Sequence, residues 1–311
     1  MREVRYNDTT LDQAYLDGLN ACFGGWGDRD QFAWVFERSS GSHPPDRMAI
    51  IDDGEFLAGS GISYRLVGLP NGASMPVGIM TGSWTLPSAR GRGIFTTIIE
   101  ESRQRSEELG CGLLLAFVTH DNPSRRALER AGSALIPTWY VFGAPEGMAP
   151  AAATSEEAPP GDEYGVAREA ALSRFVRLHY PTPEAFGGQF LQRPTPVEVR
   201  RYPSGVAIVE RAADTDRVLS HRSELSRAAL LEEIAADAAD HGRRLFQLTT
   251  CEGVPSYLEG KPGFLTALVA SEPDLRAALD TDSPVQSSAA LADPMGPHYL
   301  GPWFIEAGDR M

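Results

Sequence analysis

The sequence predicts an α/β (α+β) protein of two related domains, and three observations support this fold class. Strand-like and helix-like patterns are mixed along the first half of the chain. A segment rich in Ala, Pro, Gly and Glu interrupts these patterns near the middle. Part of the order of the first half recurs in the second half, and 311 residues are enough for roughly two domains.

The first half begins with three predicted strands. Apolar and β-branched runs predict strands over Met48–Ile51 and Leu57–Val67, joined by a turn at Asp53-Gly54. A further strand is predicted over Val77–Leu86, and it leads directly into the segment LPSARGRGIF. At least three strands therefore precede that segment.

A helix is predicted to follow from Ile94 to Leu109. Its apolar and small residues recur at the spacing of one buried helix face, namely Phe95, Ile98, Ile99, Ser102, Ser106 and Leu109. Gly110 is the expected C-terminal stop. The run LLLAFV at 113–118 predicts a strand covered on both faces, followed by a short helix over Ser124–Ala131 and a strand over ALIPTWYVF.

The central segment marks a domain boundary. Between Gly143 and Gly165 there is no apolar period, so we predict domains at 1–145 and 165–311 with a linker at 146–164. The second half contains a predicted helix over Ser226–Asp240 and then a strand, RLFQLTT.

Glycine spacing indicates that the second half is a partial copy of the first. Gly132 follows Gly110 by 22 residues, and Gly263 follows Gly242 by 21 residues. The position that corresponds to Gly93 in the second half is Leu225, so the glycine loop is not repeated. Whatever that loop binds is therefore expected to bind once per chain.

Composition narrows the classes of partner. The chain has 28 Lys and Arg against 42 Asp and Glu, and a net charge of −14 disfavours nucleic acid because phosphates attract basic surfaces. Cys22, Cys111 and Cys251 form no CxxC pair, so we expect buried free thiols and no metal site. The polar N-terminus and the lack of a long apolar run predict a cytoplasmic protein without a membrane partner.

The segment LPSARGRGIF has the features of an anion site. It stands between a strand and a helix, where backbone N–H groups and the positive end of the helix dipole face a ligand. Gly91 and Gly93 can adopt positive φ and let an anion approach, and Arg90 and Arg92 can pair with phosphate oxygens. An ordinary tight turn with solvated arginines remains an alternative.

Two familiar phosphate motifs fit this segment less well. The ATP-type loop is excluded because the sequence has no GxxxxGK[ST]. The stretch GRGIFT matches part of the dinucleotide motif, but Thr96 stands where Gly or Ala is needed. Asp121 also follows Gly93 by 28 residues rather than about 20. A dinucleotide site stays open as an alternative.

The remaining interpretation comes from TLPSARGRGIF, which resembles the acetyl-CoA loop of the GCN5-related N-acetyltransferases (GNAT). Their motif, [Q/R]-x-x-G-x-[G/A], is matched by Arg90 and Gly93, whereas Phe95 stands where Gly or Ala is usual. The resemblance follows the order of elements over 1–145 and is specific over Val77–Gly132. The second half resembles a degenerate second copy, as in tandem members of the family. This implies two domains, each a mixed, mostly antiparallel twisted sheet flanked by helices, with the second serving substrate binding or dimerisation.

The resemblance also implies the cosubstrate, acetyl-CoA, and its contacts. In this family the strand before the loop splays from its neighbour, and its backbone, here Trp84, Thr85 and Leu86, binds the pantetheine arm. The pyrophosphate is expected on the loop N–H groups of Arg90, Gly91, Arg92, Gly93, Ile94, Phe95 and Thr96. On the other side of the cofactor, Asn122 or Asp121 would supply a polar contact, and Arg125 or Arg126 would reach the 3′-phosphate.

The catalytic groups are less well defined. Leu128 replaces the tyrosine that usually protonates the leaving thiolate in this family. A CoA thiol with a pKa of about 8.5, as for cysteine, can leave unprotonated. His120 and Asp121, just past the 113–118 strand, are candidate general bases, although both also fit a structural or solvated role.

Two classes of function follow. The first is an acetyl-CoA-dependent N-acetyltransferase that acts, in a ternary complex, on an amine of a small molecule such as an antibiotic or a natural-product intermediate. The second is a non-catalytic acyl-CoA-binding module, which the leucine at the tyrosine position favours. The family resemblance also suggests a homodimer. One C-terminal cluster either lines a substrate cavity or belongs to the core: His298, Tyr299, Trp303 and Glu306.

Overall fold

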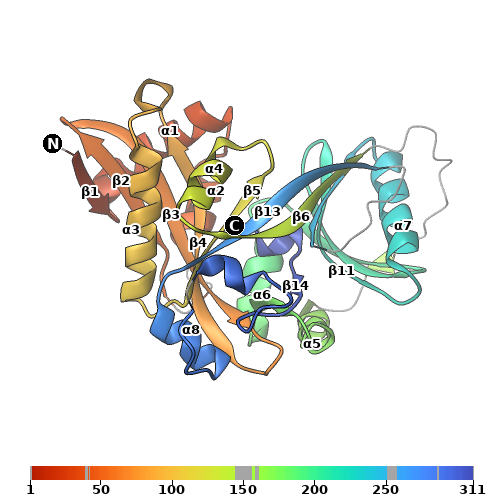
Figure 1. Ribbon diagram of the computed structural model, residues 1–311. Coiled ribbons are helices and arrows are strands. Elements are labelled where there is room, and N and C mark those ends of the chain that lie inside the picture. The colour runs from red at the N-terminus through yellow and green to blue at the C-terminus, as the bar shows by residue number, and fades with distance from the viewer. Residues whose placement is uncertain are drawn as a thin grey trace. The chain divides into compact units, whose positions relative to one another are not determined.

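The computed structural model (Figure 1) divides into two compact units. The first unit contains Met1–Leu135 and Leu265–Gly301, and the second contains Ile136–Phe264 and Pro302–Arg310. The structure describes residues 2–38, 41, 43–143, 156–157, 161–250, 258–285 and 287–310.

The boundaries of these units differ from the predicted continuous halves. Residues 265–301 return to the first unit because the end of strand β13 (Glu259–Val269) joins its sheet, where Thr266 Oγ1 donates to the Ala116 carbonyl at 3.2 Å. The predicted linker at 146–164 contains strand β7 (Glu156–Glu157) and the start of helix α5 (Gly161–Ala171). Its remaining residues, 146–155 and 158–160, lie outside the described part of the chain.

The sheet of the first unit is mixed and mostly antiparallel, which confirms the predicted fold class. Strands β1, β2, β3 and β4 pair with one another as antiparallel neighbours in that order, and β4 pairs with β5 in parallel. The end of β13 follows β5. The bounds are β1 (Arg2–Tyr6), β2 (Asp46–Asp52), β3 (Glu55–Gly68), β4 (Ser74–Thr85) and β5 (Leu113–Thr119).

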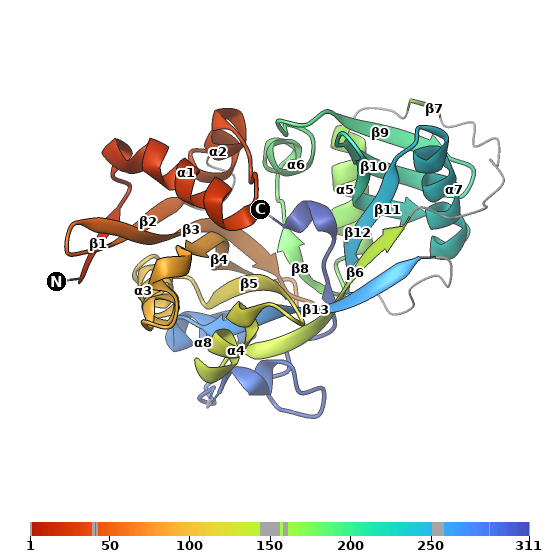
Figure 2. The same ribbon diagram turned by 90° about the horizontal axis from the view of Figure 1, so that it is seen from above.

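Helices cover both faces of this sheet. Figure 2 shows α1 and α2 on one face and α3 on the other. Helix α3 buries Ile94, Ile98, Ile99 and two serines, and a Cβ on Gly78 of β4 would stand 2.3 Å from Ser106 Oγ. The small residues therefore let α3 approach the sheet closely. The bounds are α1 (Asp12–Phe23), α2 (Arg29–Phe36), α3 (Ile94–Glu108), α4 (Pro123–Arg130) and α8 (Glu272–Leu279).

The second unit repeats the arrangement of strands. Its sheet has the order β6-β12-β11-β10-β9-β7, in which β11 and β12 are parallel and the neighbours of known register are otherwise antiparallel. A short parallel pair, β8 with β14, lies off this path. The bounds are β6 (Ala134–Gly143), β8 (Val176–His179), β9 (Val197–Tyr202), β10 (Gly205–Arg211), β11 (Thr215–Ser223), β12 (Arg244–Thr249) and β14 (Trp303–Phe304).

The core of the second unit lies under α7 (Arg227–Asp240). Leu230, Leu231 and Ile234 of this helix pack against Val209 and Val218 of the sheet. Ser226, predicted to be the first residue of this helix, is instead its N-cap, and Gly242 follows its end with a φ of 65°. Helices α5 and α6 (Pro183–Phe190) contact each other.

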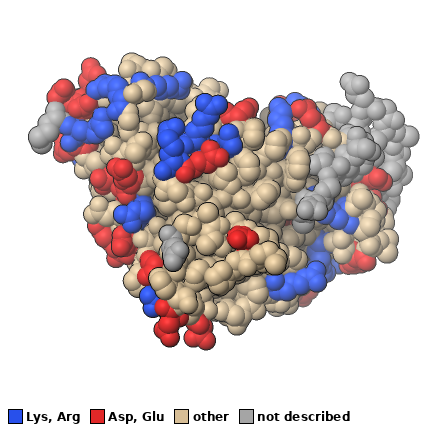
Figure 3. Space-filling model, in the orientation of Figure 1, with Lys and Arg blue, Asp and Glu red and all other residues tan. Residues whose placement is uncertain are grey.

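Three further predictions concern the cysteines, membrane segments and charge. Cys111 is buried and free, and Cys22 is free but only partly buried, while Cys251 lies outside the described residues. Among the described helices, none is long and apolar enough to cross a membrane. Basic and acidic side chains are interspersed on the face drawn in Figure 3.

Candidate active site

The candidate site begins where two parallel strands of the first unit separate. Strands β4 and β5 pair from Val77 to Met80 and from Leu113 to Ala116. Strand β4 then continues to Thr85 and β5 to Thr119 without further pairing between them, and every residue of this stretch is described. The separated edges carry backbone groups that are available to a ligand.

A bulge in β4 accompanies this separation. Gly61 pairs with Thr81, and Gly59 pairs with Trp84. Between these two pairs β4 therefore has one residue more than β3. Gly82 has a φ of 55°, and its ideal Cβ position lies 3.0 Å from the Phe36 ring. A β-bulge of this kind bends its strand. The sequence predicts a plain strand here, although a glycine inside a strand often marks a bulge.

Trp84 fixes the end of β4 through its side chain. Its ring is buried and meets Tyr15 and Phe56 edge to face, with centroids 5.7 and 5.0 Å apart. A Cβ on Gly18 of α1 would stand only 2.4 Å from this indole, so the helix packs directly on it. Any contact of Trp84 with a ligand must therefore come from its backbone, as the sequence analysis expects.

The backbone groups of Thr85 and Leu86, which follow Trp84, already form hydrogen bonds within the protein. The Thr85 carbonyl accepts from Arg90 Nε at 3.4 Å, and the Leu86 N–H donates to the Leu57 carbonyl at 2.9 Å. The Leu86 carbonyl in turn accepts from the Ala89 N–H at 2.9 Å, so both backbone groups of Leu86 already have partners within the protein, which narrows the role predicted for its backbone.

The loop between β4 and α3 is open to solvent. It consists of a 3₁₀ turn (Pro87–Ala89) and Arg90–Gly93, and no side chain caps α3. Gly91 and Gly93 have φ values of 78° and 74°, in the left-handed region, and no atom lies within 4 Å of an added Cβ at either residue. The N–H groups at the start of α3 thus face an accessible space.

The two loop arginines are held differently. Arg92 forms an ion pair with Asp52 of β2, with Nη2 and Oδ2 2.6 Å apart, and its carbonyl accepts from Arg2. Arg90 donates to the Thr85 carbonyl and forms no ion pair with a described acid. Because Arg92 already has an anionic partner, Arg90 is the better placed of the two to pair with a phosphate. Sequence reasoning could not foresee Asp52, which lies far from the loop in the chain.

The residues that follow β5 lie at the end of this strand, beyond the point where it separates from β4. His120 and Asp121 are exposed there. Asn122 is the N-cap of α4, and its Oδ1 accepts from the Ser124 N–H at 2.9 Å. Arg125 pairs with Glu129 on the same helix at 3.3 Å, and Leu128 is buried. The position where the family usually carries a tyrosine thus belongs to the core in this chain.

Comparison with known proteins agrees with this geometry. Residues 13–132 match the model of the acetyltransferase (GNAT) family, a range that includes the separating strands and the loop. A search among curated proteins finds no match.

Several solved structures share the fold. A GCN5-related N-acetyltransferase from Anabaena variabilis is 13% identical, with 89% of this chain and 75% of that chain covered at a TM-score of 0.62. A tandem GNAT protein from the clavulanic acid biosynthesis pathway is 14% identical, with coverage of 86% and 99% and a TM-score of 0.56. Eis1 from Mycobacterium abscessus is 12% identical, with coverage of 89% and 76% and a TM-score of 0.52. At these identities the likeness concerns the fold. Within the first unit, residues 13–132 match the GNAT family of acetyltransferases, and the chain shares its fold with these solved structures.

Proposed function

We propose that the chain is an acetyl-CoA-dependent N-acetyltransferase that acts on an amine of a small molecule, such as an antibiotic or a natural-product intermediate. The observation that supports it is that two structural features lie next to each other in the first unit. The unpaired edge of β4 leads directly to a loop whose two left-handed glycines leave the start of α3 uncovered. An extended pantetheine arm and a pyrophosphate need these two features side by side.

The loop is suited to hold the pyrophosphate mainly by its backbone. Residues Gly91–Phe95 would present N–H groups and the positive end of the α3 dipole to the phosphate oxygens. The N–H groups of Arg90 and Thr96, which the sequence also assigns to the pyrophosphate, instead donate to the carbonyls of Pro87 at 3.4 Å and Gly93 at 3.1 Å. Arg90 would add a charged donor, while Arg92 stays with Asp52. Asn122 has used its Oδ1 for the cap of α4, so it would offer its Nδ2–H groups to the cofactor.

The reaction would be a direct transfer. The amine nitrogen forms a bond with the thioester carbonyl carbon, an N–H of β4 polarises the carbonyl oxygen, and the carbon–sulfur bond then breaks. The amine proton passes to a base, for which exposed His120 and Asp121 are the candidates, and from there to water. Since Leu128 is buried and carries no acidic proton, the CoA sulfur leaves as the thiolate.

A second candidate, a non-catalytic acyl-CoA-binding module, is favoured by one observation. Leu128 is 2% exposed, so neither a phenol nor a water-accessible substitute occupies the usual position of the acid. Both candidates require acetyl-CoA to bind in the first unit, and they differ only in turnover.

The first test is binding. Gly93→Val should weaken the calorimetric affinity for acetyl-CoA by about 100-fold, because valine disfavours a φ of 74° and its side chain enters the space needed by phosphate. Gly72→Val is a matched control, since Gly72 also has a positive φ and open space around it but lies at the opposite end of β4. An unchanged affinity in the Gly93 variant, or binding of NADH in place of acetyl-CoA, would overturn the proposal.

The second test is turnover. Release of free CoA thiol is followed with wild-type protein, acetyl-CoA and a panel of an aminoglycoside, a polyamine and an amino-acid amide, against a blank without amine that subtracts the chain's own cysteines. Release above the blank with any amine supports the transferase. Tight acetyl-CoA binding without release from any of them favours the binding module.

A further inference from the structure

The second unit opens its sheet in the same way as the first. Strands β11 and β12 pair in parallel from Thr215 to Val218 and from Arg244 to Gln247. Strand β11 then continues to Ser223 and carries an extra residue, Leu219, relative to β10. The second unit therefore also has a pair of separating parallel strands.

This second opening is filled by the chain itself. Glu306 forms an antiparallel bridge with Thr249 at the end of β12, and the Ile305 N–H donates to Thr250 Oγ1 at 3.1 Å. On the other side, Glu306 accepts from the N–H of His221 at 2.9 Å and from Ser220 Oγ at 2.7 Å, both on β11. Residues 305–306 thus occupy the place that an extended pantetheine arm would need.

The loop of this unit is also unsuited to a pyrophosphate. It is only three residues long, Glu224–Ser226, and has no glycine. Ser226 Oγ accepts from the Ala229 N–H at 3.0 Å, so the protein itself satisfies the start of α7. A CoA molecule would find neither its arm site nor its phosphate site here.

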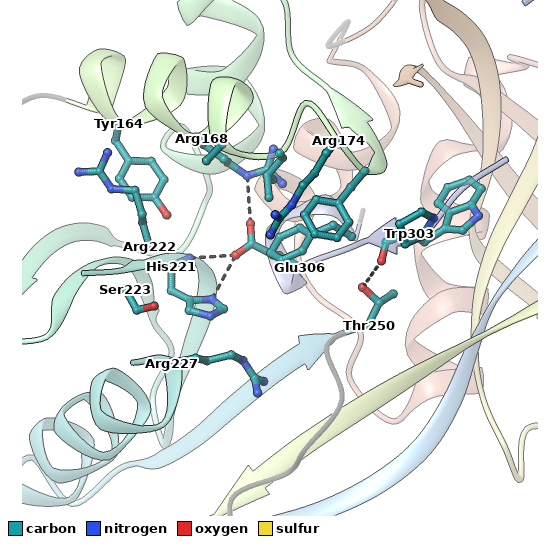
Figure 4. Close-up of a pocket in the computed structure, with 15 residues that line it drawn as sticks. Tyr164, Arg168, Arg174, His221, Arg222, Ser223, Arg227, Thr250, Trp303 and Glu306 are labelled. Carbon is teal, nitrogen blue, oxygen red and sulfur yellow. Dashed lines mark hydrogen bonds and ion pairs between the residues drawn. The ribbon is translucent and has the colours of Figure 1, made fainter. Parts of the chain in front are cut away.

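A cavity nevertheless remains beside Glu306. Its volume is about 470 Å³, which is the size of a small-molecule site, and all of its lining residues belong to the second unit. Four arginines of the described chain line it, namely Arg168, Arg174, Arg222 and Arg227. Figure 4 shows Arg168 and Arg174 on one side of Glu306, Arg227 on the other, and Arg222 beside Tyr164. This concentration of positive charge occurs in a chain whose net charge is −14.

The cavity has more positive than negative charge. Among the described residues of its lining, Glu306 is the one acid, and it pairs with buried Arg168 at 3.0 Å. Arg174 and Arg222 form no ion pair with any acid in the described part of the chain. Two cationic groups therefore border the cavity with no anion of the described protein to neutralise them.

Beside the polar Tyr164, His221, Ser223 and Thr250, the cavity has an apolar part of its lining. It comes from the turn after α5 and from the segment that includes β14, namely Leu172, Phe175, Pro302, Trp303 and Phe304. A ligand that satisfies the whole cavity must therefore combine an apolar body with an anionic head.

We propose that this cavity of the second unit binds a small organic anion, an aromatic or branched apolar group that bears a carboxylate or a phosphate. The head pairs with Arg174 and Arg222, because guanidinium groups bind both kinds of oxyanion through forked hydrogen bonds. The apolar body packs on Phe175 and Phe304. This site is separate from the acetyl-CoA site proposed in the first unit, and it explains why the second copy keeps an open cavity after losing its loop.

Calorimetry with two probes tests this site. Phenylacetate and phenyl phosphate share the apolar body and differ in the head, and phenethylamine is the cationic counterpart. We expect at least one anion to bind the wild-type chain and phenethylamine to bind at least about tenfold more weakly. Arg174→Gln and Arg222→Gln should each weaken the anion by about tenfold. Neither arginine has an acidic partner among the described residues, so both variants should fold.

Two controls complete the experiment. Arg244→Gln removes an exposed arginine from the opposite end of β12 and should leave anion binding within about twofold of wild type. Gly93→Val should also leave it unchanged, which separates this proposal from the acetyl-CoA site. Any one of three results overturns the proposal. The first is that neither anion binds at millimolar concentration, and the second is that the Arg174 and Arg222 variants bind the anion as tightly as wild type. The third is that Arg222→Gln, rather than Gly93→Val, abolishes acetyl-CoA binding.

Discussion

The two units part a pair of parallel strands at corresponding points of their sheets. In the first unit β4 leaves β5 after Met80, and in the second β11 leaves β12 after Val218. Each departing strand carries a one-residue bulge shortly afterwards, at Gly82–Ser83 in β4 and at Leu219 in β11. Because only one of the bulges contains a glycine, the separation of the strands is a property of the shared sheet rather than of that residue.

The two units differ in the loop that follows the departing strand and in what lies between the separated strands. In the first unit two left-handed glycines leave α3 without a side-chain cap, whereas in the second Ser226 caps α7. Glu306 closes the second opening through hydrogen bonds to β11 and a bridge to β12. The comparison teaches that the sheet provides an opening, and that a few loop and terminal residues decide whether a ligand or the chain itself fills it.

The largest expected effect comes from removing the charge that fills the second opening. Glu306 is 2% exposed, and Arg168, which is 3% exposed, holds it at 3.0 Å. Glu306→Gln leaves a buried guanidinium with one anion fewer, so the free energy of unfolding should fall by about 3 kcal/mol in urea titrations at pH 7.

The matched control for this change is Glu259→Gln in the same unit. The Glu259 side chain is 64% exposed and 3.8 Å from Lys261, so its loss should change the free energy of unfolding by less than about 0.5 kcal/mol. Equal effects of the two substitutions would show that Glu306 does not hold the opening closed.

The same contacts predict how the stability of the second unit depends on pH. Burial opposes ionisation of Glu306, but Arg168 and hydrogen bonds from His221 and Ser220 outweigh it and lower its pKa from 4.5 to about 2. The stability from Glu306 is therefore complete above pH 4.5 and is lost as the pH falls toward 2. Urea titrations at several pH values should show a smaller acid loss in Glu306→Gln than in wild type.

Asp309 acts in the opposite direction. Burial, assisted by the charge of Glu306, raises its pKa from 3.8 to about 6 against the pull of Arg168. Because its folded pKa lies above its unfolded value, Asp309 contributes stability that grows as the pH falls from 6 toward 3.8. A wild-type free energy of unfolding that falls steadily from pH 6 to 4, with no gain relative to Asp309→Asn, would contradict this assignment.

Local patterns predicted many elements of the fold because their causes are local. The turn at Asp53-Gly54 needs positive φ at both residues, and the structure has 51° and 83° there. The buried face of α3 follows from its residue spacing, although Phe95, predicted to lie on it, is only partly buried. The return of Leu265–Gly301 to the first unit could not be predicted, because the partner of a strand is set by contacts distant in sequence.

The two candidate sites also combine features that local sequence patterns predict with features that depend on contacts distant in sequence. The glycine loop could be identified from residues in sequence order, whereas the pairing of Arg92 with Asp52 joins two strand ends that no local pattern connects. The C-terminal cluster was divided by the structure. Trp303 and Glu306 line the cavity of the second unit, and His298 and Tyr299 belong to the first unit. Residue types indicated a site near the end of the chain, but only the fold could assign its members.

The smallest expected effect concerns the cap that distinguishes the two loops. Ser226→Ala removes the acceptor of the Ala229 N–H and should lower the free energy of unfolding by about 1 kcal/mol in urea titrations. Ser173→Ala, an exposed serine in the same unit, should leave it nearly unchanged. Gly93 caps α3 without any side-chain hydrogen bond, so no capping side chain competes with a bound anion at that helix start. Acetyl-CoA should therefore raise the unfolding temperature of Ser226→Ala by as much as that of wild type, and a smaller rise would mean that the second loop shares in binding it.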